Sequence, residues 1–237
     1  MSHKFRLSNL VLLTTLFFAP SIAAQPFPEN FHMIYELRQE DKSVGKMLVE
    51  YKSKNSKYEL KAVTEGDGIL RLLGNRDLNS KGKITNSGFF PNVFEVKNIK
   101  KPNKNILAIF NSLSKKIEIK YNNEISTLDL GVQDLDLAIY LYQFNFEKTD
   151  QGIYKFNVLE GKKRREYEYK KVRDEAIQME KTTLLTEMYE GKIISKENST
   201  HYVWISKGKY RVPVKLRVST DFGLLMDQVM VKTNLAL

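Results

Sequence analysis

Hydrophobic and polar residues alternate with a period of two along much of the chain. In the clearest run, 210–218, every second residue is apolar and the residues between are Arg211, Pro213, Lys215 and Arg217. Such alternation predicts a β-strand with one buried face and one face in water. Pro213 has no backbone N–H to donate, so we expect the strand to lie at a sheet edge, or to bulge, at this residue.

The same alternation recurs in many other short segments. These segments are 31–37, 47–51, 58–64, 106–110, 117–121, 154–158, 165–171, 176–179, 184–188, 193–195, 202–206 and 225–231. Asn55 and Ser56, between the second and third of them, predict a hairpin turn. Short strands that follow one another about every 8–12 residues predict a mainly β fold. We expect a single strongly curved antiparallel sheet, either a half-barrel or a partly open barrel.

The segment 134–144 has a different period. Its apolar residues recur at helical spacing from Leu135 to Tyr142, and Asp134 is suited to cap the first turn of a helix. Because the other side of this helix is apolar as well, we expect it to be short and packed on the concave face of the sheet. A further helical turn is predicted at 69–73.

The N-terminus has the three zones of a secretory signal peptide. Lys4 and Arg6 precede the uncharged apolar run 10–18, and small residues follow, with cleavage expected after Ala23 or Ala24. The apolar run is about half of the roughly 20 residues that a membrane-spanning helix needs. We therefore predict a signal peptide at 1–24 and a single β-rich domain at 25–237, located in a bacterial periplasm. No later segment is apolar enough to span a membrane.

Composition narrows the possibilities further. The chain has no cysteine, which excludes disulfides, thiol catalysis and a lipoprotein anchor. The formal charge of +10 falls by two, to +8, when Lys4 and Arg6 are removed. A basic exported protein could attract anionic lipid head groups, acidic glycans or nucleic acid, although solvated lysines are the plainer explanation. The basic clusters 97–104 and 162–165 are typical of turns.

The charged run 164–171 does not predict nucleic-acid binding. Tyr167 and Tyr169 share one face of the expected strand, and residues of both charge signs share the other. This pattern is typical of a solvated strand face.

No constellation of residues indicates a reaction. The only histidines beyond the signal peptide are His32 and His201, which have no partner at metal-binding spacing. A GxSxG motif and a glycine-rich phosphate loop are both missing. Asp134 and Asp136 would lie on different sides of a helix, which suits capping better than catalysis. We therefore expect a protein that is not an enzyme, with no catalytic residue, no metal site and no cofactor.

Aromatic residues are the remaining candidates for a site. A strongly curved sheet can leave a cavity that such side chains line, and a plain hydrophobic core would use the same residues. The candidate ligand-binding residues are Phe90, Tyr140, Tyr142, Phe144 and Trp204.

Three segments together resemble motifs of the bacterial domain-of-unknown-function family 3108. They are Ser80-Lys81-Gly82 with 87–94 (SGFFPNVF), Gln133-Asp134 before the aromatic segment, and Trp204-Ile205-Ser206 with 212–216 (VPVKL). Members usually carry a serine shortly after the aspartate, and this chain does not, which weakens any catalytic role for such a serine. The resemblance, which runs from about Phe31 onward, implies an exported β-rich protein without an established activity. The family's curved sheet looks similar to the half-barrels of periplasmic lipoprotein carriers and lipid-binding envelope proteins.

Three functions remain open at this point. The first is a monomeric, non-enzymatic binding or envelope-maintenance protein that holds an amphipathic or anionic envelope ligand on the concave face of the sheet. The second is a structural module that docks another envelope protein through an edge strand at Pro213 or through basic loops. The third is a hydrolase of envelope polymers with a carboxylate pair about 5–10 Å apart.

Overall fold

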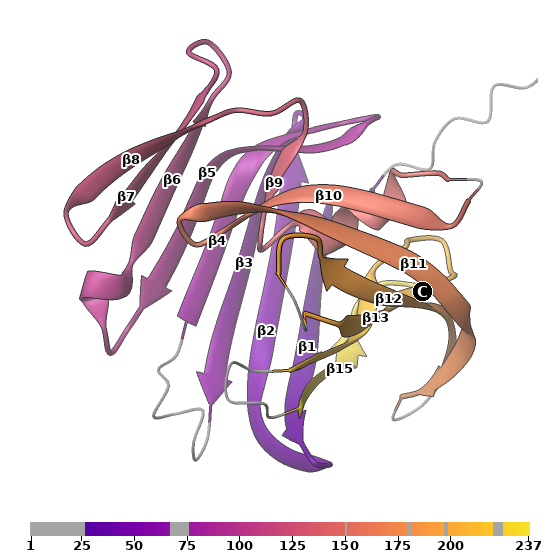
Figure 1. Ribbon diagram of the computed structural model, residues 1–237. Helices are drawn as coiled ribbons and strands as arrows, with labels where there is room; N and C mark the ends of the chain where they lie inside the picture. Colours follow the sequence, from indigo (N-terminus) through magenta and orange to yellow (C-terminus); the bar gives the residue numbers. More distant parts are fainter. Residues whose placement is uncertain (1–26, 67–75, 150, 180–181, 197–198, 220–224) are drawn as a thin grey trace, which may run out of the picture.

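One sheet of fifteen strands dominates the computed structural model, which describes residues 27–66, 76–149, 151–179, 182–196, 199–219 and 225–237 (Figure 1). The strands are β1 (Asn30–Gln39), β2 (Lys42–Lys54), β3 (Lys57–Gly66), β4 (Arg76–Thr85), β5 (Gly88–Asn98), β6 (Ile106–Asn111), β7 (Lys116–Tyr121), β8 (Glu124–Asp129), β9 (Asp134–Asp136), β10 (Ile153–Glu160), β11 (Lys163–Gln178), β12 (Thr183–Ile193), β13 (His201–Ser206), β14 (Pro213–Ser219) and β15 (Leu225–Thr233). The described residues also form two short 3₁₀-helices, η1 (Pro102–Lys104) and η2 (Tyr140–Asn145). The mainly β fold is thus confirmed, whereas the predicted signal peptide and the helical turn at 69–73 lie outside the described residues.

The order of the strands shows that the sheet curls back on itself. From one edge to the other it runs β8 to β1 and then β15 to β9, so β8 and β9 lie at opposite edges although they are consecutive in the chain. The connection between them is residues 130–133, and a fully extended chain from Asp129 to Asp134 spans less than about 18 Å. The two edges therefore lie near each other, and β9 also contacts β5. The expected single, strongly curved and unclosed sheet is confirmed.

One ladder departs from the expected antiparallel sheet. β9 pairs with β10 in parallel, with Asp134 opposite Asn157, whereas the other ladders are antiparallel. β8 and β9 are not joined by a hairpin. Residues 130–133 instead carry the chain from the edge at β8 to the opposite edge of the sheet, where β9 adds to β10 in parallel.

The predicted helix at 134–144 is wrong over its first half. Asp134–Asp136 is strand β9, and the helical part is the single short η2. Asp136 starts the turn before η2, because its carboxylate accepts hydrogen bonds from the backbone N–H groups of Ala138 (2.9 Å) and Ile139 (3.2 Å). Asp134 caps nothing. Its carboxylate accepts hydrogen bonds from the Gly131 N–H and from Arg164.

Strand 210–218 is shorter than its alternation predicts. β14 begins at Pro213 and lies between β13 and β15, so the predicted edge position is wrong, whereas a register shift opposite Pro213 confirms the bulge. Arg211 was expected to face water, and it is instead half-buried. Its guanidinium donates to the backbone carbonyl of Phe144 (3.0 Å) and pairs with Glu187 (2.6 Å), so it holds the end of η2.

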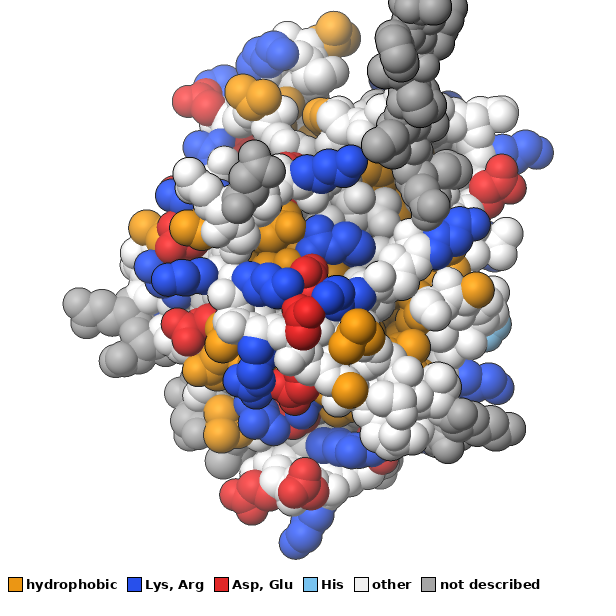
Figure 2. Space-filling view, turned by 90° about the vertical axis from the view of Figure 1, so that its right-hand side faces the viewer, with side chains coloured by type: hydrophobic (Ala, Val, Ile, Leu, Met, Phe, Trp, Pro, Cys, Tyr) orange, Lys and Arg blue, Asp and Glu red, His pale blue; other side chains and the backbone are white. Residues whose placement is uncertain are grey.

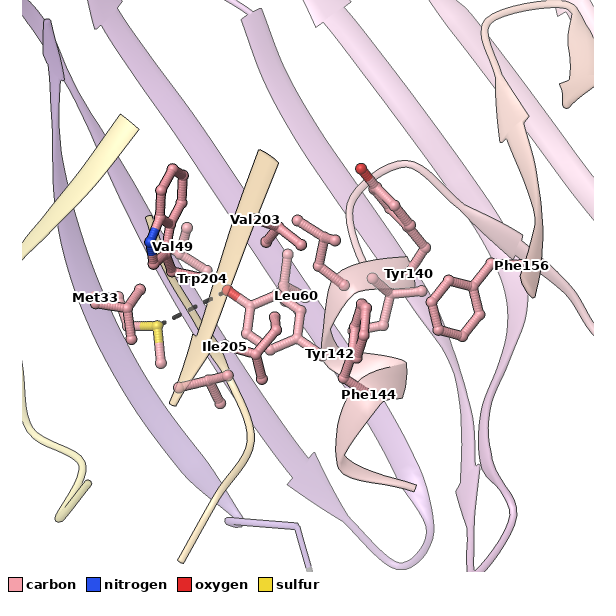
Figure 3. Packing of buried hydrophobic residues seen from close by; sticks show 14 of the residues in the cluster. Met33, Val49, Leu60, Tyr140, Tyr142, Phe144, Phe156, Val203, Trp204 and Ile205 are labelled. Carbon is pink, nitrogen blue, oxygen red and sulfur yellow. Dashed lines mark hydrogen bonds between the residues drawn. The ribbon is translucent and has the colours of Figure 1, made fainter. Parts of the chain in front are cut away.

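The concave face of the sheet is covered by a hydrophobic core of two clusters, which share the partly buried Leu78, Leu137 and Ala138. Alternate residues of the strands point inward, and the side chains of η2 fill the space between them (Figure 3). Aromatic pairs are frequent in this core, for example Phe144 with Tyr189 at 5.0 Å between ring centroids and Phe31 with Tyr51 at 4.9 Å. The core thus anchors the strands whose outer faces carry the charged residues.

Candidate functional site

A groove of about 920 Å³ lies where β1 begins and where the β2–β3 and β4–β5 hairpins turn. Its lining is rich in charged side chains from the outer face of β2, β3 and β4. The lining residues are Glu29, Asn30, Phe31, His32, Glu50, Tyr51, Lys52, Ser53, Lys54, Lys57, Tyr58, Glu59, Lys81, Gly82, Lys83, Asn92 and Asn234.

The hairpin between β2 and β3 places two of its lysines face to face. Asn55 and Ser56 both have positive φ (51° and 58°), as a two-residue turn of the favoured hairpin type requires. Lys54 and Lys57 are consequently a directly opposed cross-strand pair. The hairpin turn predicted at Asn55–Ser56 is confirmed, and it sets the two lysines directly opposite each other.

A third lysine extends this pair into a row across three strands. Lys57 lies opposite Lys83 of β4, so Lys54, Lys57 and Lys83 are neighbours on one face of the sheet. All three side chains are exposed, and none makes an ion pair among the described residues. Like charges directly opposite each other destabilise a sheet. The row of three lysines therefore does not contribute to the stability of the fold.

The next row along the strands contains Glu59, one of three acids that line the groove. Glu59 lies between Lys52 and Lys81 and forms ion pairs with Lys81 (3.1 Å) and Lys61 (3.4 Å). Burial raises the pKa of the Glu59 carboxyl, but hydrogen bonds from Lys81 and Lys61 outweigh it and hold the pKa below its usual value. Glu59 is therefore already paired with Lys61 and Lys81, and it does not neutralise the lysine row.

Charges are distributed differently on another face. Figure 2 looks onto the right-hand side of Figure 1 and shows basic and acidic side chains interspersed there. Two lysines of β11 and β12 are paired with acids, with Lys171 at 2.7 Å from Glu187 and Lys192 at 3.0 Å from Glu168. Lys54, Lys57 and Lys83 form no such ion pair among the described residues.

The five aromatic residues singled out from the sequence fall into two groups. Tyr140, Tyr142, Phe144 and Trp204 are buried together in the core (Figure 3). Phe90 is half-buried on the opposite, outer face, where it pairs with Lys83. None of the five lines the groove, and a ligand-binding role for them remains a prediction.

A buried polar chain runs from the groove towards η2. Tyr58, which lines the groove, has its hydroxyl 2.9 Å from Ser80 Oγ, and Ser80 donates to Asp136 at 2.5 Å. Burial raises the pKa of Asp136 to about 7, although the hydrogen bonds from Ser80, Ala138 and Ile139 act to lower it. Tyr58, Ser80 and Asp136 are all buried. This series of hydrogen bonds is therefore suited to holding η2 on the sheet.

His201 belongs to a second buried chain. Its Nδ1 lies 3.0 Å from the carbonyl of Ser199, which can only accept, so Nδ1 carries the proton and Nε2 accepts from the Tyr169 hydroxyl at 2.8 Å. Burial lowers the pKa of His201 and favours this neutral form. Tyr140 of η2 continues the chain, with its hydroxyl oxygen 3.2 Å from that of Tyr169. His201 thus has a structural role.

The two aspartates that the sequence singled out are not placed in the groove. Asp134 and Asp136 are both buried and lie outside the groove. No group of three or more His, Asp or Glu side chains that could hold a metal ion occurs among the residues of known placement. The groove itself is lined by three other acids, Glu29, Glu50 and Glu59. The hydrolase that the sequence left open stays a prediction.

Sequence reasoning missed the lysine row because a row depends on register. The confirmed hairpin at Asn55–Ser56 would have sufficed to place Lys54 opposite Lys57. Lys83 comes from a separate strand, and only the β3–β4 ladder shows that it joins them.

Comparisons with known proteins concern the family and the fold. The model of the family "Protein of unknown function (DUF3108)" matches residues 33–229. A solved structure from Brucella abortus, described as a β-barrel-like protein of the domain of unknown function DUF1849, is similar in fold, with a TM-score of 0.57 and 12% identity. The similarity covers 88% of this chain and 98% of that one. No curated protein matches the chain. No helix among the described residues is long and apolar enough to cross a membrane.

Proposed function

The chain belongs to the DUF3108 family, whose description names no activity, and we propose that it is an exported, non-enzymatic binding protein for an anionic amphiphile. In this proposal the groove beside the β2–β3 hairpin binds the head group, and the cations are Lys54, Lys57 and Lys83. The observation that carries it is the directly opposed row of these three lysines, which have no acidic partner in the described part of the chain.

The chemistry of the groove favours a phosphate-bearing head group. Lysine ammonium groups bind phosphate as point charges without a fixed geometry. The three adjacent ammonium groups repel one another in the free protein. An anion bound among them would offset this repulsion, which makes the free energy of binding more favourable. A volume of about 920 Å³ lies within the range of small-molecule sites.

The proposal places the protein in the periplasm. Its support there is the sequence of residues 1–24, with a basic start, an apolar run and small residues before the expected cleavage site. Molecules with phosphate head groups and acyl chains are constituents of the envelope that such a protein would meet. The ligand thus sits on the outer face of the sheet rather than on its packed concave face.

A titration of the mature protein with lysophosphatidic acid, below its micellar concentration, tests the proposal. Saturable binding that weakens as salt is raised supports it, because ion pairs at an open site are screened by salt. Absence of binding at low ionic strength contradicts it.

A second candidate function is docking of another envelope protein, and the free edge of the sheet favours it. β8 pairs with β7 on one side only, and Ile125 on this strand is 64% exposed. Unpaired strand edges are templates for an added strand. Cross-linking from position 125 in intact cells would identify such a partner, and a failure to capture one there would remove this candidate.

A further inference from the structure

We infer that the acyl chain of the bound amphiphile lies across the outer face of β5 and β6, in contact with Phe90, Val93 and Ile109. This inference rests on the proposed function, because it assigns the apolar part of the same ligand. It defines the ligand class as an amphiphile with a phosphate head group and an acyl chain that leaves the groove sideways along the sheet.

The three apolar residues continue directly from the lysine groove. Lys83 pairs with Phe90, Lys81 pairs with Val93, and Val93 pairs in turn with Ile109 of β6. Directly paired residues lie on the same face of a sheet, so cationic and apolar side chains are immediate neighbours there. Asn92, the extra residue of the bulge in β5, lines the groove at this junction.

The core does not need these side chains. Phe89 and Phe94 of the same strand point inward and are fully buried. Phe90 and Val93 point outward and are half-buried, and Ile109 is 41% exposed. A strand that is apolar on both faces is expected when both faces are covered. The outer face of β5 thus carries, at Phe90 and Val93, the apolar side chains of a covered surface.

The apolar strip has polar borders that limit its extent. Ile109 pairs with Glu118 of β7, and Glu95 on β5 forms an ion pair with Lys97 at 3.4 Å. From β4 to β6 the strip crosses two strand spacings, about 10 Å. It therefore suits part of one acyl chain and is too narrow for an extended apolar interface.

The test compares lysophosphatidic acid with glycerol 3-phosphate, which carries the same head group without the chain. Titrations use the full mature protein and the variant Ile109→Ser. The matched control is Leu185→Ser on β12, a leucine that is 55% exposed and lies outside both the groove and the strip. We expect wild type to bind lysophosphatidic acid more tightly than glycerol 3-phosphate. Ile109→Ser should lose about fivefold of the affinity for the amphiphile alone, since only the contact with the chain is reduced.

The outcomes separate the two proposals. If both ligands bind wild type equally, or Ile109→Ser binds the amphiphile like the control, the acyl path is overturned while the head-group site stands. If neither ligand binds wild type, the proposed function and the acyl path are both overturned. If Ile109→Ser has the same unfolding midpoint as wild type, its loss of affinity does not come from destabilisation of the fold.

Discussion

Ser80 of β4 donates a 2.5 Å hydrogen bond to the buried carboxylate of Asp136, at the end of β9. This contact joins β4 to the turn that precedes η2. Asp136 also accepts the N–H groups of Ala138 and Ile139, so one carboxylate both shapes the turn and attaches it to β4. The η2 segment is therefore held on the concave face by a polar contact as well as by its apolar side chains.

Replacing Ser80 by alanine should destabilise the fold. The buried carboxylate of Asp136 and the hydroxyl of Tyr58 would each lose a partner, at a cost of about 1–3 kcal/mol. Urea unfolding of wild type and Ser80→Ala measures the difference. Ser126→Ala, at an exposed position on β8, is the control and should change the unfolding free energy by less than about 0.5 kcal/mol. Equal effects of the two substitutions would rule out the role given to Ser80.

Stability should depend on pH through Asp136. Burial raises the pKa of this carboxyl from 3.8 to about 7, so between these values the folded protein holds a proton that the unfolded chain has lost. The unfolding free energy consequently falls as the pH rises from about 4 to about 7 and is flat above. From pH 5 to pH 7.5, wild type should lose roughly 2–3 kcal/mol relative to Asp136→Asn, whose side chain stays neutral. Parallel stability curves for the two proteins would show that Asp136 does not titrate in this range.

Gly191 leaves the room in which His201 reaches Tyr169. Gly191 of β12 lies directly between these two residues in neighbouring strands, and a Cβ there would collide with both rings. Gly191→Ala should lower the unfolding free energy by about 1–3 kcal/mol, as overpacking of a core does. Adding His201→Ala to this variant should recover part of the loss, because it removes one of the two collisions. A fully additive double variant would mean that the rings do not compete for this space.

The N-terminus of the exported protein should begin at Ala24 or Gln25. Intact-mass analysis of protein isolated from the periplasm measures this directly, because cleavage after Ala23 and cleavage after Ala24 give different masses. Full-length chain retained in the cytoplasm would contradict the proposed localisation.

Much of the fold could be predicted because alternation is a local signal. One buried face per strand is encoded every second residue, and the turn at Asn55–Ser56 is encoded by two adjacent residues. The helix predicted at 134–144 is wrong over its first half. Its apolar residues follow a helical spacing, although their burial does not come from a helix. The pairing of Asp134 with Asn157, which is distant in the sequence, makes the first residues a strand, and the capping residue is Asp136 rather than Asp134.

The candidate site was less predictable for the same reason. Phe90 is one of several aromatic candidates in the sequence, yet its place on the outer face follows from its pairing with Lys83, and the bulge at Asn92 brings Val93 to the same face. The lysine row is assembled from three strands, and each of its residues taken alone is an ordinary exposed lysine. A site of this kind can be read only when the register of the sheet is known.

The measurement that most directly tests the lysine groove is the affinity for lysophosphatidic acid after charge removal. One variant combines Lys54→Gln, Lys57→Gln and Lys83→Gln, and its control combines Lys104→Gln, Lys115→Gln and Lys148→Gln, which remove the same charge from exposed lysines elsewhere. At low salt we predict at least about a tenfold loss of affinity for the groove variant, roughly 1.4 kcal/mol, and less than about a twofold change for the control. Removing the opposed charges should also leave the fold as stable as wild type or more so. Equal affinities of a well-folded groove variant and its control would contradict the account.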